Sequence, residues 1–215
     1  MPASPPCERE QPGSIPAMGI VSVSGPAGTP KSLHQLKISL RNVRPPIWRR
    51  LQVSSATSLG GLHFVLQAAM GWDDSHLHQF TIGGETYADD RVEDPRGGRP
   101  KHEDRARLDK VAPLGTRFRY EYDFGDGWEH DVVVEKILPP EPAVTYPRCL
   151  TGRRACPPED CGGPWGYASL LAAIADPEGT EDRELLDWVG NDFDPGAFDP
   201  ATVNALFVPR THRRS

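Results

Sequence analysis

Residues 118–136, FRYEYDFGDGWEHDVVVEK, carry the strongest local signal in this sequence. Large apolar side chains alternate with polar ones on both sides of the segment GDG at 125–127, which is the period-two pattern of strands with one buried face. Glycine adopts positive φ without steric cost, so this segment suits a turn between antiparallel strands. The stretch therefore predicts a β-hairpin whose aromatic face is buried.

The register of this hairpin follows from the side chains that each alternative would bury. A two-residue turn would place acidic residues opposite the aromatic ones. A three-residue loop, with Gly127 in the left-handed conformation, instead pairs Phe124 with Trp128 and Tyr122 with His130. We expect the second register, because a slip of one residue would move every side chain to the other face.

The expected register also selects the polar residues of the hairpin that could take part in chemistry. It places His130 on the apolar face and brings Asp123 and Glu129 together on the other face, with Asp126 in the turn. Two neighbouring carboxylates repel each other unless a cation, a shared proton or a base such as Arg119 intervenes. These four residues of the hairpin are therefore candidate site residues.

Composition limits the class of protein. The 215 residues suit one well-buried domain, and the 21 glycines, 23 prolines and hydrophobic fraction of 37% predict extensive loops rather than a helical bundle. A net charge of −6 disfavours a surface that tracks a phosphate backbone over its whole length. Without a signal peptide or membrane-spanning run, and with four cysteines, we expect a soluble cytoplasmic protein.

The two ends of the chain differ in composition from its middle. Residues 1–31 are rich in proline, glycine, serine and alanine without periodicity, which predicts a disordered N-terminal tail. Residues 209–215 form a basic C-terminal tail. Residues 32–208 are expected to form a single domain.

Within this domain, strand patterns come first and helix patterns last. Strands are predicted at 36–40, 47–53, 76–82 and 85–88, and a helix that Ser58 or Thr57 caps is predicted to end at Gly71. Residues 89–107 read as a charged, solvated loop, and residues 149–163 as a second loop. Helices are expected after Pro164, Thr180 and Pro200. The order predicts an α+β fold: a mainly antiparallel sheet with an N-terminal helix and C-terminal helices packed on it.

Several blocks of sequence, in this order, resemble the plasmid pRiA4b ORF-3-like family. The blocks are IWRRL at 47–51, LHFVLQAAMGW at 62–72, HLHQF at 76–80, YEYDFGDGWEH at 120–130, CPPEDCGG at 156–163, WGY at 165–167 and NDFD at 191–194. The resemblance implies a compact α+β domain of bacteria and archaea, often named in connection with plasmids and transposable elements. It implies no set of catalytic residues, so site residues have to come from their own chemistry.

Two histidines form the first candidate site outside the hairpin. His76 and His78 lie two apart in a predicted strand, so both would point to one face, where they could bind a metal together. The same pattern fits two histidines near a sheet edge that are hydrogen-bonded to backbone or carboxylate groups. Both interpretations remain open.

Three cysteines form the second candidate site. Cys149, Cys156 and Cys161 are separated by six and by four residues, unlike the paired Cys-x2-Cys turns of zinc ribbons. A zinc site completed by a distant histidine would use them as thiolates. Alternatively, they are small buried residues beneath a rigid loop.

Two acids close to these cysteines form the third candidate. Glu159 and Asp160 precede a predicted helix, where the simplest role of a carboxylate is to cap free backbone N–H groups. The sharper hypothesis is that they converge with Asp123, Glu129 and one histidine of the HLH segment as an acid–base or divalent-metal site.

Two functions follow from these candidates. The first is a binding or interaction module associated with plasmids or transposable elements, with a protein or nucleic acid as partner and no membrane. The second is a metal-dependent hydrolase or nuclease that uses the HLH segment with the acids of the hairpin and of the PPED loop, and zinc or another divalent metal as cofactor.

Overall fold

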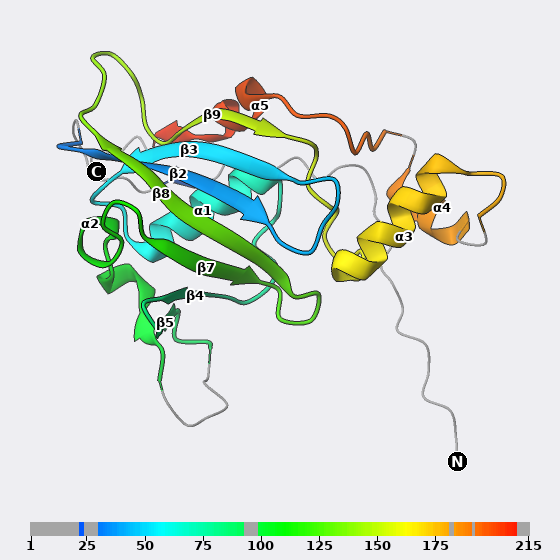
Figure 1. Ribbon diagram of the computed structural model, residues 1–215, viewed down its shortest axis with the longest axis horizontal. Helices are drawn as coiled ribbons and strands as arrows, with labels where there is room; N and C mark the ends of the chain where they lie inside the picture. The colour runs from blue at the N-terminus through cyan, green and yellow to red at the C-terminus, as the bar shows by residue number, and fades with distance from the viewer. Residues whose placement is uncertain (1–21, 24–29, 93–98, 181–182, 191, 210–215) are drawn as a thin grey trace, which may run out of the picture.

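The structure is a computed structural model, which describes residues 22–23, 30–92, 99–180, 183–190 and 192–209 (Figure 1). The predicted N-terminal tail and the basic end of the chain lie largely outside the described residues. Two residues of that predicted tail, Ser22–Val23 (β1), pair in parallel with Val208–Pro209 (β10) in a separate two-stranded sheet.

The main sheet has eight strands in the order β6-β5-β4-β7-β8-β2-β3-β9. Neighbouring strands are antiparallel, except that β5 and β6 are parallel. The strands are Leu33–Leu40 (β2), Trp48–Ser54 (β3), His78–Ile82 (β4), Glu85–Ala88 (β5), Lys101–His102 (β6), Arg117–Tyr122 (β7), Trp128–Leu138 (β8) and Arg148–Arg153 (β9).

Helix Leu59–Met70 (α1) lies against one face of this sheet, behind β2, β3 and β8 in the view of Figure 1. It has the predicted ends. The hydroxyl of Ser58 accepts a hydrogen bond from the N–H of Gly61, and Gly71 has the left-handed φ of 90° that glycine favours at this position. Because its apolar side chains fill the space above the sheet, α1 and the aromatic face of the hairpin form the core.

The remaining helices are short or lie at the margins of the sheet. Glu103–Arg105 (η1) and Leu108–Val111 (α2) precede β7, while Gly163–Ala175 (α3) and Arg183–Val189 (α4) pack together beyond the sheet end where β7 turns into β8 (Figure 1). Pro200–Leu206 (α5) lies beside β9. The expected α+β fold, with a mainly antiparallel sheet in one domain, is thus confirmed.

The register of the hairpin differs from the prediction by two residues. Tyr122 lies opposite Trp128 and Tyr120 opposite His130, so the loop runs over five residues, 123–127. Asp123 causes this earlier turn, because it adopts a left-handed φ of 55° and its Oδ1 accepts hydrogen bonds from two N–H groups of the loop. Since the slip is by two positions, the faces stay as expected and His130 is buried.

In the described part of the chain, no helix has the length and apolar character needed to cross a bilayer.

Candidate functional site

Three loops meet at the sheet end that carries the hairpin turn: residues 71–77 between α1 and β4, the turn 123–127, and residues 157–162 before α3. The indole N–H of Trp72 donates to the carbonyl of Pro157 over 2.9 Å, and the N–H of Asp73 donates to Glu159 over 2.9 Å. The N–H of Gly162 donates to the Asp126 carboxylate over 3.2 Å. These bonds, together with the 2.9 Å bond from the N–H of Asp123 to the carbonyl of Leu77, hold the HLH segment (76–78), the hairpin turn (123–127) and the PPED segment (157–160) side by side.

The convergence brings together three ligating side chains, His76, Asp123 and Asp160, which we name the outer cluster. Nε2 of His76 lies 3.2 Å from Oδ1 of Asp160 and 3.7 Å from Oδ2 of Asp123. One ligand atom from each residue lies within 4.8 Å of the others. The buried Nε2 atom has no hydrogen-bond partner among the described residues, although two carboxylates flank it.

The backbone holds both acids of the outer cluster in unusual conformations. Asp123 and Asp160 have left-handed φ values of 55° and 58°, which are uncommon for residues other than glycine. Oδ1 of Asp123 is taken up by N–H groups of its own turn, which leaves Oδ2 directed at His76. The Asp160 side chain is 70% exposed, so the cluster is open to solvent on that side.

Glu159 and Tyr122 lie beside the outer cluster. The Tyr122 hydroxyl donates to Glu159 and accepts from the N–H of Ser75 over 3.0 Å, while its ring meets the His76 ring edge-on at a centroid distance of 5.8 Å. Burial raises the pKa of Glu159 above its usual range. Burial also raises the pKa of Tyr122, so the phenol remains protonated and available as a donor at neutral pH.

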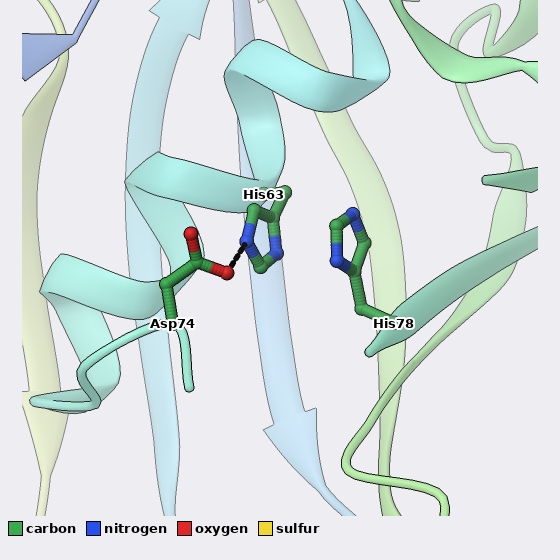
Figure 2. A group of neighbouring side chains, drawn as sticks. All are labelled: His63, Asp74 and His78. Atoms are coloured by element: carbon green, nitrogen blue, oxygen red, sulfur yellow. Dashed lines mark hydrogen bonds and ion pairs between the residues drawn. The ribbon is translucent and has the colours of Figure 1, made fainter. Parts of the chain in front are cut away.

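A second group, the inner cluster, consists of His63, Asp74 and His78 (Figure 2). His63 comes from α1, Asp74 from the loop and His78 from the first position of β4. Nε2 of His63 lies 2.7 Å from Oδ1 of Asp74, and the two imidazole rings stack with centroids 3.5 Å and planes 3° apart. Burial lowers the pKa of His63, although its hydrogen bond with Asp74 acts in the opposite direction.

The two histidines of the HLH segment therefore lie in different clusters. The expectation that both point to one face required a strand from residue 76, but β4 begins at His78 and His76 belongs to the preceding loop. His78 is buried and pairs with Glu103, with Nε2 and Oε2 2.8 Å apart, whereas His76 faces the hairpin turn and the PPED loop.

Of the other candidate residues in the hairpin, Glu129 lies apart from the outer cluster, and Asp126 helps to hold the loops around it together. Glu129 lies opposite Glu121, not beside Asp123 as expected, and its oxygens pair with Arg41 at 2.8 Å and Arg119 at 3.0 Å. Asp126 joins the turn to the PPED loop.

His130 is fully buried in the core. Its ring lies 5.4 Å from that of Trp72 and 5.3 Å from that of Tyr120, measured between centroids. Burial lowers the pKa of His130 to about 4, so its ring is neutral at physiological pH.

The three candidate cysteines are free and buried. Cys149 lies in β9, and the sulfur of Cys156 lies 3.1 Å from that of Met70. Burial raises the pKa of Cys149 to about 11 and that of Cys161 to about 12, so these thiols are protonated at neutral pH. Within the described residues, neither of the two groups of metal-ligating atoms contains a cysteine.

His63, Asp74 and Glu103 are residues that the sequence patterns did not single out. Glu103 belongs to the charged segment expected to be a solvated loop, yet it is buried against His78. A signal was present for His63, because His63 and Gln67 are polar residues four apart in an otherwise apolar stretch of α1. Both side chains bind the buried Tyr120 hydroxyl, at 2.8 Å and 2.9 Å.

Comparison with known proteins gives consistent results. The family model described as plasmid pRiA4b ORF-3-like protein matches residues 32–202. The uncharacterized protein y4hQ of Sinorhizobium fredii (strain NBRC 101917 / NGR234) is 39% identical over 184 residues, which cover 80% of this chain and 89% of the relative. The crystal structure of MM3350 from Methanosarcina mazei Go1, a protein of unknown function, is 39% identical, has a TM-score of 0.75, and aligns over 81% of this chain and 97% of the other.

Proposed function

We propose that this chain, which belongs to the plasmid pRiA4b ORF-3-like family, is a binding domain whose outer cluster holds a divalent cation. The cation would bind a phosphate group of a nucleic-acid partner through its remaining coordination positions. The observation that carries the proposal is the buried Nε2 atom of His76, which lies between two carboxylate oxygens without a hydrogen-bond partner among the described residues.

The spacing of these three atoms supports a cation. Ligands bound at about 2.0–2.2 Å to a tetrahedral zinc ion lie roughly 3.4 Å from one another. The His76 nitrogen lies 3.2 Å from one carboxylate oxygen and 3.7 Å from the other. Two carboxylates directed at one place also repel each other unless positive charge lies between them. An imidazole and two carboxylates suit zinc or manganese.

The charge of the chain explains why a cation would matter for a nucleic-acid partner. With a net charge of −6, the protein as a whole repels a phosphate backbone. A divalent ion at an exposed loop supplies local positive charge together with free coordination positions. The family description refers to a plasmid reading frame, which supports a partner of this kind. The three free thiols support a cytoplasmic location, where cysteines stay reduced.

Metal binding is tested with the full chain after treatment with a chelator. Zinc and manganese are titrated by calorimetry into the wild type, His76→Ala and the control Glu85→Ala, whose exposed carboxylate pairs with Lys101 and belongs to neither cluster. We expect wild type and control to bind the same number of ions, and His76→Ala to bind one ion fewer or to bind it at least tenfold more weakly. The same number of ions, bound with the same affinities, in all three proteins would refute the proposed site.

The partner is tested by fluorescence anisotropy with a labelled oligonucleotide and with a labelled acidic peptide. We expect the metal-loaded wild type to bind the oligonucleotide, and the chelated protein and His76→Ala to bind it at least tenfold more weakly. If the metal increased the affinity for the peptide and not for the oligonucleotide, the partner would instead be a protein.

A hydrolase or nuclease is the second candidate, and Glu159 is the observation that favours it. A bound ion lowers the pKa of a coordinated water, and a nearby carboxylate of raised pKa suits the role of general base. Glu159 is next to Asp160, and burial raises its pKa. The test is cleavage of a phosphodiester substrate by the metal-loaded protein, with Glu159→Gln expected to abolish turnover and keep the metal. Absence of turnover in the loaded wild type would leave binding as the function.

A further inference from the structure

We propose that the inner cluster is a second metal site, which binds a divalent transition-metal ion through Nε2 of His63, Oδ1 of Asp74 and Nδ1 of His78. It lies in the interior, between α1 and the start of β4, and its ligands come from three separate segments of the chain (Figure 2). The site does not depend on the outer cluster, since the two groups share no residue.

Each histidine of the inner cluster has one ring nitrogen held by a partner outside the cluster. Nε2 of His78 lies 2.8 Å from the Glu103 carboxylate, and Nδ1 of His63 lies 2.8 Å from the Tyr120 hydroxyl oxygen. Histidines that bind metals are typically oriented in this way, by a carboxylate or another oxygen at the far nitrogen. The arrangement leaves the second nitrogen of each ring for the cluster.

The free nitrogen of His78 is the observation that points to a ligand. His78 is 2% exposed, and its buried Nδ1 atom has no hydrogen-bond partner in the described part of the chain. In the neutral ring, Nε2–H donates to the Glu103 carboxylate, and Nδ1 is then an acceptor that carries a lone pair. A buried polar atom without a partner costs about 1–3 kcal/mol, which a bound cation would offset.

Charge supports a cation in the same place. Asp74 pairs with His63, and the buried Glu103 pairs with His78. Because the two imidazole rings stack, these two ion pairs lie next to each other. Two protonated rings at a centroid distance of 3.5 Å would repel each other, so protonation alone balances the two acids poorly. A divalent ion bound to neutral imidazoles balances both charges.

The stacked geometry sets one requirement for binding. An imidazole lone pair lies in the plane of its ring, so two parallel rings cannot both direct a nitrogen at one ion. One ring must therefore tilt out of the stack as the ion binds. This movement would alter the environments of both rings, and it gives a signature independent of any activity.

The experiment uses the full chain with His76→Ala and Asp160→Asn, which removes the outer cluster. Zinc binding is measured by calorimetry, and cobalt binding by the visible absorption of the tetrahedral ion. We expect this double variant to bind one ion, and the further change Asp74→Asn to weaken binding at least tenfold. Glu103→Gln, which keeps the shape of the side chain, should weaken it about 10- to 100-fold.

The outcomes separate this inference from the proposed function. A folded double variant that binds no zinc or cobalt overturns the inner site, whatever the wild type binds. Binding that is unchanged by both Asp74→Asn and Glu103→Gln overturns it as well. Because Asp74 is partly exposed, Asp74→Asn is expected to keep the circular dichroism of the parent. Shifts of the His63 and His78 ring signals in NMR spectra on adding zinc would support it, and their absence at saturating zinc would contradict it.

Discussion

Gly163 faces the carbonyl oxygen of Asp126 so closely that a β-carbon at position 163 would lie 2.3 Å from that oxygen. The glycine also has a φ of 68°, which side chains rarely adopt. Both features come from the close approach of the loop before α3 to the hairpin turn. The same approach brings Asp160 to His76, so the geometry of the outer cluster depends on this glycine contact.

Gly163→Ala should therefore destabilise the protein and weaken the outer cluster. We expect a loss of about 2 kcal/mol or more in the free energy of unfolding, since the strained φ and the backbone clash act together. Urea unfolding measures the loss. Gly84→Ala is the matched control, because Gly84 has a φ of 85° and no atom within 4 Å of the added carbon. Equal losses in the two variants would show that the contact with Asp126 contributes nothing.

The two adjacent arginines of the IWRRL segment should differ in their effect on stability. Arg49 is 2% exposed, and its guanidinium donates to the carbonyls of Ala69 and Arg153 and stacks on Phe198 at 4.1 Å. It thereby joins the last turn of α1 to β9. Arg50 lies on the other face and pairs with Glu135 at 2.6 Å, near solvent.

We expect Arg49→Met to lower the free energy of unfolding by about 2–4 kcal/mol, because it leaves buried carbonyls without donors. Arg50→Met should cost about 1 kcal/mol or less, as for other pairs near solvent. Thermal and urea unfolding of both variants provide the measurement. The interpretation of Arg49 as a structural link fails if Arg50→Met is the more damaging change.

Because the pKa of His130 is lowered by burial, we expect the folded protein to lose stability in acid. Its pKa is about 4 in the folded protein, against 6.5 for the free side chain, so the unfolded chain takes up a proton first as the pH falls. Its contribution to stability is constant above pH 6.5 and declines between pH 6.5 and about 4. The two pKa values differ by an amount that corresponds to roughly 3 kcal/mol.

His130→Leu removes this titration and two ring nitrogens that have no hydrogen-bond partner among the described residues. Its stability relative to the wild type should rise as the pH is lowered from 7 to 4.5, which urea midpoints at several pH values would measure. A constant difference between the two proteins over this range would exclude His130 as the source of acid sensitivity.

The sequence predicted those parts of the fold that depend on local patterns. Ser58 and Gly71 bound α1 as expected, and the alternation in the hairpin identified its buried face. The register was wrong because it depends on the side chain of Asp123, which starts the turn one residue pair earlier. The separation of His76 from His78 depends on where β4 begins, and alternation does not reveal that position.

The meeting of distant segments was a hypothesis that local patterns could not decide. The approach of Asp160 to His76 is produced by loop contacts such as that of Gly162 with Asp126, between residues far apart in the chain. The burial of Glu103 required knowledge that η1 packs against α1, since the charges of its segment indicate exposure. Charge content indicates the average environment of a segment, and single buried charges depend on their tertiary partners.

Zinc should raise the melting temperature of the wild type, with contributions from both clusters. An ion at 100 times its dissociation constant adds about 2.7 kcal/mol for each site that binds only the folded state. For a domain of this size, that corresponds to roughly 5–10 °C per site. The increment should fall in His76→Ala with Asp160→Asn, and should fall again, to about half of the inner site's contribution or less, when Asp74→Asn is added. Magnesium, which prefers an all-oxygen octahedral shell, should have a smaller effect than zinc.

If zinc stabilised the wild type and the triple variant equally, the ion would bind elsewhere, and Cys149, Cys156 and Cys161 would again be the leading candidates. Their buried, protonated thiols argue against that result, because zinc binds the thiolate and each thiol would first have to lose its proton.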